Sequence, residues 1–232
     1  MEGIGDIPAR QLIPALGQFG YVNYHTVINT WIVIAALILV AILIRRRLSP
    51  VPGKLQVVAE MFIGGFDHLV ADALEFETVE KNRKLFHLIA AEFMFLALCN
   101  YIGLLPGFGR GEPTADYNTP LALALMAFVL WTYWGIKEKG LFGYIKSFFE
   151  PIFVIAPLNF VGELSRILSM SFRLFGNMMG GGVIVLVVSK LLYQIAVPVV
   201  PMMLFFGLFV GSVQAFVFTM LTLTYIAVSC KE

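Results

Sequence analysis

The sequence has few charged residues. Asp, Glu, Lys and Arg make up 13% of the 232 residues, whereas hydrophobic residues make up 59%. A soluble domain is about one-quarter charged, so this composition excludes an ordinary soluble protein. Because a chain in lipid must satisfy its own backbone hydrogen bonds, the long apolar runs predict an all-α polytopic membrane protein.

Other features are also scarce. The net charge of +1 lacks the basic excess typical of nucleic-acid binding, and we expect no nucleic-acid partner. The two cysteines, Cys99 and Cys230, belong to different hydrophobic segments, which argues against a disulfide framework. The sequence has no nucleotide-binding motif, and we expect no metal and no cofactor. Arg10 is the only base before the first apolar run, so we interpret that run as a retained span and not as a cleaved signal.

Hydrophobic runs of about 20 residues predict five membrane-crossing helices. No soluble domain, repeat or low-complexity linker interrupts them, so we expect one membrane domain over residues 1–232. The last two runs exceed the length of a perpendicular span, which predicts a hairpin of two strongly tilted helices. The predicted spans are residues 25–47, 85–105, 119–136, 158–190 and 202–230.

Basic residues indicate the orientation of these spans. Arg45, Arg46 and Arg47 follow the first span, and such clusters tend to be cytoplasmic. We therefore expect residues 1–24 to form an outer leader and the C-terminus to be cytoplasmic, in a bacterial-type inner membrane. Residues 54–76 show a helical period of apolar side chains, which predicts an amphipathic interfacial helix. An ordinary helix packed on other cytoplasmic protein fits this pattern equally well.

Arg173 is the most informative residue. Between residues 151 and 230 the only charged residues are Glu163, Arg166, Arg173 and Lys190. A guanidinium stays protonated in proteins, and placing it at membrane depth costs about 2.5 kcal/mol or more. Such an arginine faces water, a partner charge or a protein interior, so it marks a functional site. A structural role, with bonds to helix carbonyls and a neighbouring amide, is the alternative.

Polar and small residues share the helical face of Arg173. Arg166 lies seven residues before it and Asn177 four residues after it. Glu163 lies ten residues before it, about 15 Å along a helix, which is too far for a direct ion pair. We therefore expect the counter-charge to come from another subunit. Small residues let a neighbouring helix approach closely, and those expected to face such a partner are Gly176, Gly180 and Gly181.

Polar groups in other spans could form a path for ions to the arginine. Gln214 is the only amide in the last span and could approach Arg173 if the last two helices form a hairpin. Polar residues in membrane helices also commonly form hydrogen bonds between helices, so each of these residues has a structural role as its alternative. The remaining candidates are Ser212 on the same span, and Glu92, His87, Asn100 and Asp116 further away.

Four motifs resemble those of subunit a of F-type ATP synthases. Residues 171–178 contain the run RLFGN, and residues 100–107 resemble the pattern N-L-x-G-L-x-P-G. Residues 113–118 resemble P-T-A-D-x-N, and residues 214–222 resemble Q-A-F-x-F. The motifs occur in the order and spacing of the family, so the resemblance covers most of the chain.

The resemblance implies a stator subunit of the Fo sector that lies beside a rotating ring of c subunits. Arg173 would then be the essential arginine between two ion half-channels, and Asn177, Gln214 and Arg166 match polar positions of the family. The implied partners are the c-ring, the b subunits of the peripheral stalk, the F1 sector and the lipid bilayer. The chain itself would not be an enzyme, because the ATP chemistry would belong to F1.

The sequence departs from the family pattern along the expected ion path. Many members carry a carboxylate or histidine at the positions of Gly182 and Gly207, and often a carboxylate at Asn159. We hypothesise that Glu163 or Glu92 partly substitutes for them. The sequence leaves open whether protons or sodium ions move.

Two other classes of protein compete with the stator. One is a stand-alone secondary transporter or channel with an anion on Arg173, although the internal repeats typical of transporters are not visible. The other is a purely structural membrane scaffold.

Overall fold

The computed structural model describes residues 9–11, 21–46, 53–74, 79–104, 112–149, 155–191 and 199–231. Its long helices are α1 (Tyr24–Arg46), α2 (Lys54–Leu74), α3 (Val79–Tyr101), α4 (Asn118–Ser147), α5 (Ala156–Leu191) and α7 (Gly211–Lys231). Its short helices are η2 (Ile102–Leu104), η3 (Pro113–Ala115), α6 (Val199–Leu204) and the π-helix η5 (Phe205–Val210).

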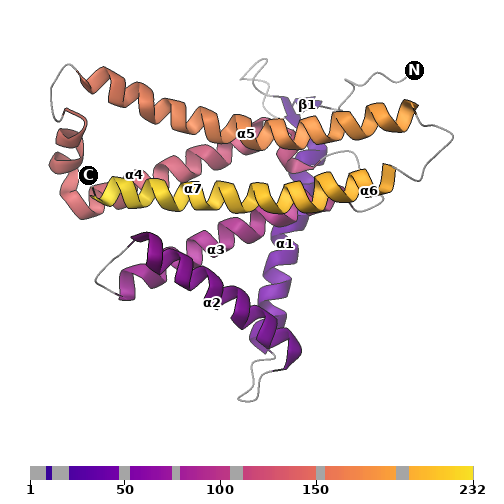
Figure 1. Ribbon diagram of the computed structural model, residues 1–232, viewed down its shortest axis with the longest axis horizontal. Coiled ribbons are helices and arrows are strands. Elements are labelled where there is room, and N and C mark those ends of the chain that lie inside the picture. The colour runs from indigo at the N-terminus through magenta and orange to yellow at the C-terminus, as the bar shows by residue number, and fades with distance from the viewer. Residues whose placement is uncertain are drawn as a thin grey trace.

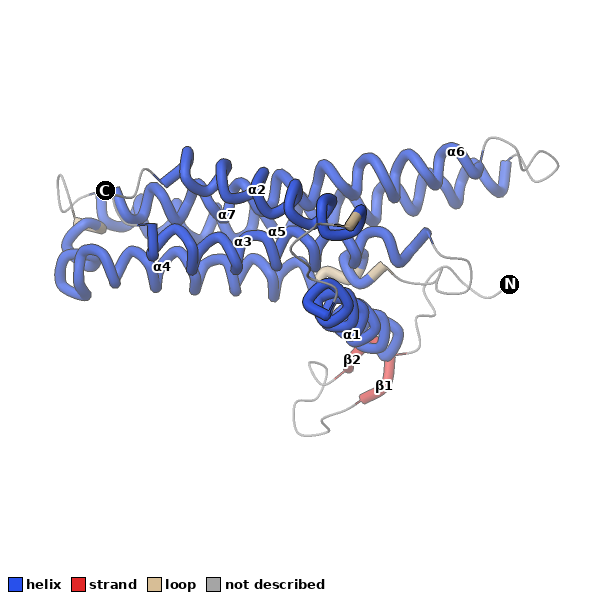
Figure 2. The backbone as a smooth tube through the Cα atoms, turned by 90° about the horizontal axis from the view of Figure 1, so that it is seen from below, coloured by secondary structure: helices blue, strands red, loops and turns tan. Residues whose placement is uncertain are grey.

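The described chain contains five helices that are long and apolar enough to cross a membrane. It is therefore an all-α integral membrane protein, as predicted. Helix α5 runs beside the rod of α6, η5 and α7 and antiparallel to it, which is the predicted hairpin (Figure 1). Helix α7 packs on α3 and α4, and α4 also packs on α5. Figure 2 shows α1 nearly end-on, because it crosses the direction of the other long helices.

A short pair of strands precedes the first span. Strand β1 (Ala9–Gln11) pairs with β2 (Tyr21–Asn23) in antiparallel register, with Arg10 opposite Val22. The sequence did not predict this pair, whose second strand leads directly into α1. The rest of the leader, and Arg47 of the basic cluster, lie outside the described residues.

The amphipathic helix α2 lies against the bundle. Phe66 and Val70 are buried, and the ring of Phe66 lies 5.0 Å from that of Phe93 on α3 (centroid to centroid). On the other side of α2, Met61 is 73% exposed. One apolar stripe of α2 thus packs on its own chain, and a second remains exposed, as expected of a helix at the membrane surface.

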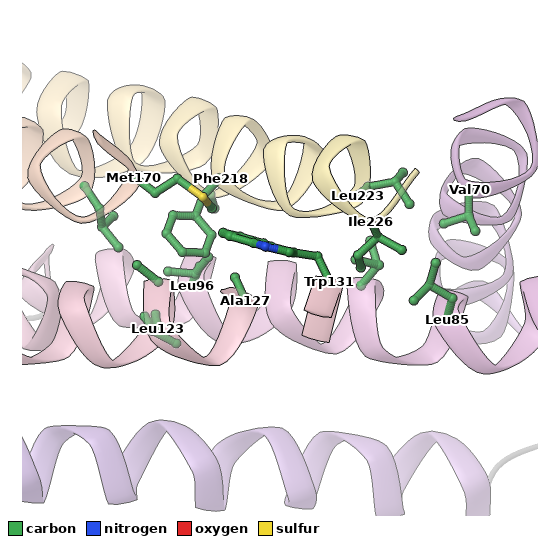
Figure 3. Packing of buried hydrophobic residues seen from close by; sticks show 14 of the residues in the cluster. Val70, Leu85, Leu96, Leu123, Ala127, Trp131, Met170, Phe218, Leu223 and Ile226 are labelled. Carbon is green, nitrogen blue, oxygen red and sulfur yellow. The ribbon is translucent and has the colours of Figure 1, made fainter. Parts of the chain in front are cut away.

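The core lies where α3, α4, α5 and α7 meet. Trp131 of α4 and Phe218 of α7 are both 1% exposed, and they lie beside Leu96 of α3 and Met170 of α5 (Figure 3). Trp131 also meets Tyr225 at a ring-centroid distance of 5.2 Å. Helices in lipid associate mainly through close packing, so this interlocked layer fixes the relative positions of the four helices.

Two helices extend beyond the predicted spans. Helix α3 begins at Val79 and not at residue 85, because polar residues continue the helix beyond its apolar run. Helix α4 continues past residue 136 to Ser147, with a bend at Gly140. Gly140 has φ 76°, a conformation that side chains with a Cβ rarely adopt. The apolar run predicts where a helix can cross lipid, but not where it ends.

We predict that Phe218→Ala lowers the stability of the protein. In soluble cores such a change costs about 3–5 kcal/mol. In lipid the transfer part of this cost is smaller but the lost packing remains, so we expect at least about 1 kcal/mol. The measurement is the midpoint of thermal unfolding in detergent. The control is Phe142→Ala, since Phe142 is 90% exposed; equal midpoints for both variants would contradict the packing assigned to Phe218.

Candidate functional site

Arg173 lies on an exposed face of α5. Its neighbours on that face, Phe172 and Gly176, are also exposed. On the opposite face Leu174 and Met178 are buried in the core. A helix repeats every 3.6 residues, so its bulky apolar side chains anchor one side and leave the arginine on the other. Among the residues that the structure describes, no side chain forms a hydrogen bond or ion pair with Arg173.

A side-chain hydrogen bond joins the two helices of the hairpin one turn after the arginine. The Asn177 Nδ2 atom donates to Gln214 Oε1 at 2.6 Å. Gln214 is 3% exposed, and its Nε2 atom is buried without a partner in the described chain. The hairpin therefore brings Gln214 to Asn177, next to the arginine on the helix, as the sequence analysis considered.

Glu163 and Arg166 form a separate cluster on α5. The Arg166 guanidinium donates to Glu163 Oε1, and the Trp131 indole donates to Glu163 Oε2 at 3.0 Å. Arg166 also lies over the ring of Tyr225, 5.2 Å from its centroid. Glu163 thus pairs with Arg166 and not with Arg173. Its bond to Trp131 was not predicted, because the two residues lie on different helices.

The three glycines expected to face a partner differ in their surroundings. A Cβ atom added at Gly176 or Gly180 would meet nothing within 4 Å. At Gly181 it would lie 3.1 Å from the Phe206 ring, and Gly181 is buried. The expectation for Gly181 is therefore wrong, because successive residues turn by about 100° on a helix and this one faces into the hairpin.

Asn100 and Ser212 link α3 to the start of α7. The Asn100 Nδ2 atom donates to the Gly211 carbonyl at 2.9 Å, and Asn100 Oδ1 accepts from Thr114 at 2.9 Å. The Ser212 and Tyr101 hydroxyls lie 2.6 Å apart. Asn100 and Thr114 are fully buried, so this network holds the hairpin against α3 and η3.

The other polar candidates contact residues other than the arginine. Asp116 accepts hydrogen bonds from Thr26 at 3.1 Å and from Asn118 at 3.0 Å. Glu92 is buried, and Thr222 lies 3.3 Å from its Oε1 atom. His87 is exposed and contacts the ring of Phe86. Within the part of the chain that the structure describes, none of these three side chains forms a hydrogen bond or ion pair with Arg173.

A cavity of about 350 Å³ opens between the later part of α5 and the segment of α6 and η5. Its polar lining side chains are Asn177, Ser189 and Glu112, and the two positions noted as departures, Gly182 and Gly207, both line it. Burial raises the pKa of the Glu112 carboxyl to about 7. Glu112 was not among the candidates predicted from the sequence. Its position in a loop rich in Gly and Pro gave no signal of burial.

The match to known proteins extends over nearly the whole chain. A family model described as "ATP synthase A chain" matches residues 27–227. The chain belongs to this family. It is 42% identical over 207 residues to "ATP synthase subunit a" of Geotalea daltonii, which covers 88% of this chain and 86% of that protein.

Other members of the ATP synthase A chain family show similar agreement. The Desulfosudis oleivorans "ATP synthase subunit a" is 40% identical over 223 residues, which cover 94% of this chain and 93% of the relative. The Moorella thermoacetica protein of the same name is 39% identical over 204 residues, with 88% and 89% covered. Membership confirms the resemblance found in the sequence. As an ATP synthase A chain, the protein is an ion-translocating membrane subunit that is not catalytic by itself.

We predict that Asn177 and Gln214 are energetically coupled. In a double-mutant cycle with Asn177→Ala and Gln214→Ala, we expect a coupling energy of about 0.6 kcal/mol or more, as measured for hydrogen bonds between membrane helices. The measurement is the free energy of unfolding in detergent. A control cycle combines Asn177→Ala with Thr224→Ala, since Thr224 bonds only to Met220 O on its own helix. Additive effects in both cycles would contradict the coupling.

Proposed function

We propose that this chain is the stator subunit of the Fo sector and that the exposed face of α5 lies against a rotating ring of c subunits. The observation that carries the proposal is the guanidinium of Arg173, which has no partner among the described residues and lies on an exposed face of α5 next to apolar side chains such as Phe172. A permanent charge there is costly in lipid. A carboxylate on a neighbouring subunit would supply the missing counter-charge.

Arg173 acts on that carboxylate electrostatically. A fixed positive charge nearby favours the ionised form of a carboxyl group. A carboxyl of the ring that approaches Arg173 therefore releases its proton, and it takes up another after it has passed. Rotation in one direction results if the proton leaves and enters by different paths, which we assign to two half-channels on either side of the arginine.

The arginine also separates the two half-channels. Because the guanidinium stays charged, a cation that moves directly from one path to the other has to pass a positive charge. Each elementary charge that crosses the membrane releases about 2.3 kcal/mol per 100 mV of potential. A direct leak would lose this energy without turning the ring, so a permanent charge at this point preserves the coupling.

Polar groups lie on both sides of Arg173 along α5. On one side are Glu163 and Arg166, and on the other are Asn177 and the cavity. We assign the first side to the cytoplasmic half-channel and the second to the outer one, with the N-terminus outside and the C-terminus cytoplasmic in a bacterial-type inner membrane. The b subunits of the peripheral stalk hold the chain still relative to the F1 sector, which carries out the ATP chemistry.

The exposure of Arg173 favours a stator over a stand-alone transporter. Transporters bind their substrates at the bilayer midplane between structural repeats, in sites enclosed by the protein. Here the arginine faces away from the core formed by α3, α4 and α7. An outward-facing charge requires a second protein to complete the site.

We predict that Arg173→Ala abolishes ATP-driven acidification of membrane vesicles that carry the whole complex. Without the fixed charge, the ring carboxyl keeps its proton and the two paths are no longer separated. Acidification is followed with a pH-sensitive dye, and assembly is checked by co-purification of the c-ring. The control is Lys54→Ala on α2, an exposed base far from α5 in sequence. Normal acidification by the Arg173→Ala complex would exclude the proposed role.

We predict that a cysteine at Gly176 forms cross-links to cysteines introduced on the outer face of the c-ring. A side chain at Gly176 meets open space, whereas Met178, two residues later, is buried in the core. Met178→Cys is therefore the matched control and should give no cross-link. The measurement is the a–c adduct seen by electrophoresis after oxidation. Equal yields from the two positions would contradict the proposed contact face.

A further inference from the structure

We propose that Glu112 is the proton-transferring group of the cavity between α5 and η5, at a place where Gly182 and Gly207 offer no side chain. Nothing in the four sequence motifs assigns this role to Glu112. The inference rests on the proposed function, since it concerns the path by which protons reach the face of Arg173.

The position of Glu112 is fixed by a close approach to η2. A Cβ atom added at Gly103 would overlap the Cγ and Oε1 atoms of Glu112. The carboxyl therefore lies directly on the backbone of Gly103, in space that only glycine leaves open. A second tight contact involves the next residue of η2, because a Cβ atom at Gly207 would overlap Leu104. The sequence thus keeps glycine at two positions that shape the cavity around this carboxyl.

Among the described residues that line the cavity, Glu112 is the only one with a titratable side chain. The other polar lining groups, Asn177 and Ser189, can pass hydrogen bonds but cannot hold a charge. The nearest charged residues along α5 are Arg173, four residues before Asn177, and Lys190, which is exposed and follows Ser189. Between η3 and α4, the carboxylate of Asp116 accepts hydrogen bonds from Thr26 and Asn118.

The chemistry of Glu112 suits proton transfer at neutral pH. Its burial raises the pKa of the carboxyl to about 7, so the protonated and ionised forms are both populated near that pH. A carboxylate takes a proton from water on one side and returns it to water on the other side. A group of this pKa does both steps without a large energy difference.

The cavity is long and wide enough to carry water to the arginine's face. Water takes about 30 Å³ per molecule in the liquid, so the 350 Å³ of the cavity hold several molecules. Ser189 and Asn177 lie twelve residues apart on α5, about 18 Å along the helix. Asn177 is one turn from Arg173. A proton that leaves Glu112 toward Asn177 therefore arrives about one helical turn from Arg173.

The two carboxylates first considered as substitutes are placed elsewhere. Glu163 is bound by Arg166 and Trp131, and Glu92 lies next to Thr222 on the inner side of α7. Neither lines the cavity. The hypothesis that one of them replaces the missing group at Gly182 or Gly207 is therefore not supported, and Glu112 takes that place.

The test uses vesicles with the complete ATP synthase and the variant Glu112→Gln, which keeps the size and polarity of the side chain but cannot ionise. We expect ATP-driven acidification, and passive proton conduction after removal of F1, to fall by at least about tenfold. We also expect the remaining conduction to lose its dependence on pH near neutrality. Glu112→Asp should retain part of the rate. Glu60→Gln, an exposed carboxylate on α2, is the control and should change neither measurement.

A rescue variant separates a proton-transferring role from a structural one. A Cβ atom at Gly182 would meet nothing within 4 Å, so Gly182→Glu places a carboxyl in the same cavity without a clash. Combined with Glu112→Gln, it should restore at least about half of the lost conduction, since proton transfer needs a carboxyl in the cavity and not a particular backbone position. The matched control is Gly64→Glu in the same background, because Gly64 also faces open space but lies on α2. It should restore nothing.

The outcomes separate this inference from the proposed function. Normal conduction and pH dependence in Glu112→Gln, with loss of acidification in Arg173→Ala, would overturn the role of Glu112 and leave the stator role intact. Loss of conduction that Gly182→Glu fails to restore, in a complex that still binds the c-ring, would also overturn it, since Glu112 would then be structural. Normal acidification in both Glu112→Gln and Arg173→Ala would overturn the proposed function itself.

Discussion

A guanidinium that cannot lose its proton has to be held on an apolar helix without being neutralised by its neighbours. The arrangement of α5 meets this requirement. Leu174 and Met178 are buried on one face, and Arg173 is exposed on the other. The single carboxylate nearby in the sequence, Glu163, is engaged by Arg166 and Trp131. The charge thus remains available to a second protein, and the fold of α3, α4 and α7 serves as a rigid support for this one helix.

Polar residues of the bundle fall into two groups with different physical roles. Asn100 and Asp116 are satisfied by hydrogen bonds to other segments of the chain, so they fix the positions of helices. The side chains of Arg173 and Glu112 have no hydrogen-bond partner among the described residues, and each can interact with groups from outside the chain. An unsatisfied polar group is costly in an apolar medium. Whether a side chain has a hydrogen-bond partner within the chain therefore separates structural residues from candidate ion-transferring ones better than residue type does.

Local signals in the sequence predict the helices well. Apolar runs show where lipid can be crossed, and one arginine in such a run is costly wherever the helix packs. Contacts between distant segments are not visible in this way. Glu112 comes into the cavity only because η2 packs on η5 and η3 packs on α5, and Gly181 is buried only because the hairpin brings Phe206 to it. Such contacts depend on side-chain packing across helices, for which a single sequence has no periodic signal.

Asn177 joins the two functional surfaces of α5. It is exposed on the face of Arg173, and it also lines the cavity that contains Glu112. Its bond to Gln214 fixes its position relative to α7. The separation between the cavity and the arginine is therefore set by the packing of two long helices and not by a loop. In the proposed function, a proton path of constant length then lies beside the c-ring, which moves past the exposed face while the opposite face stays anchored in the core.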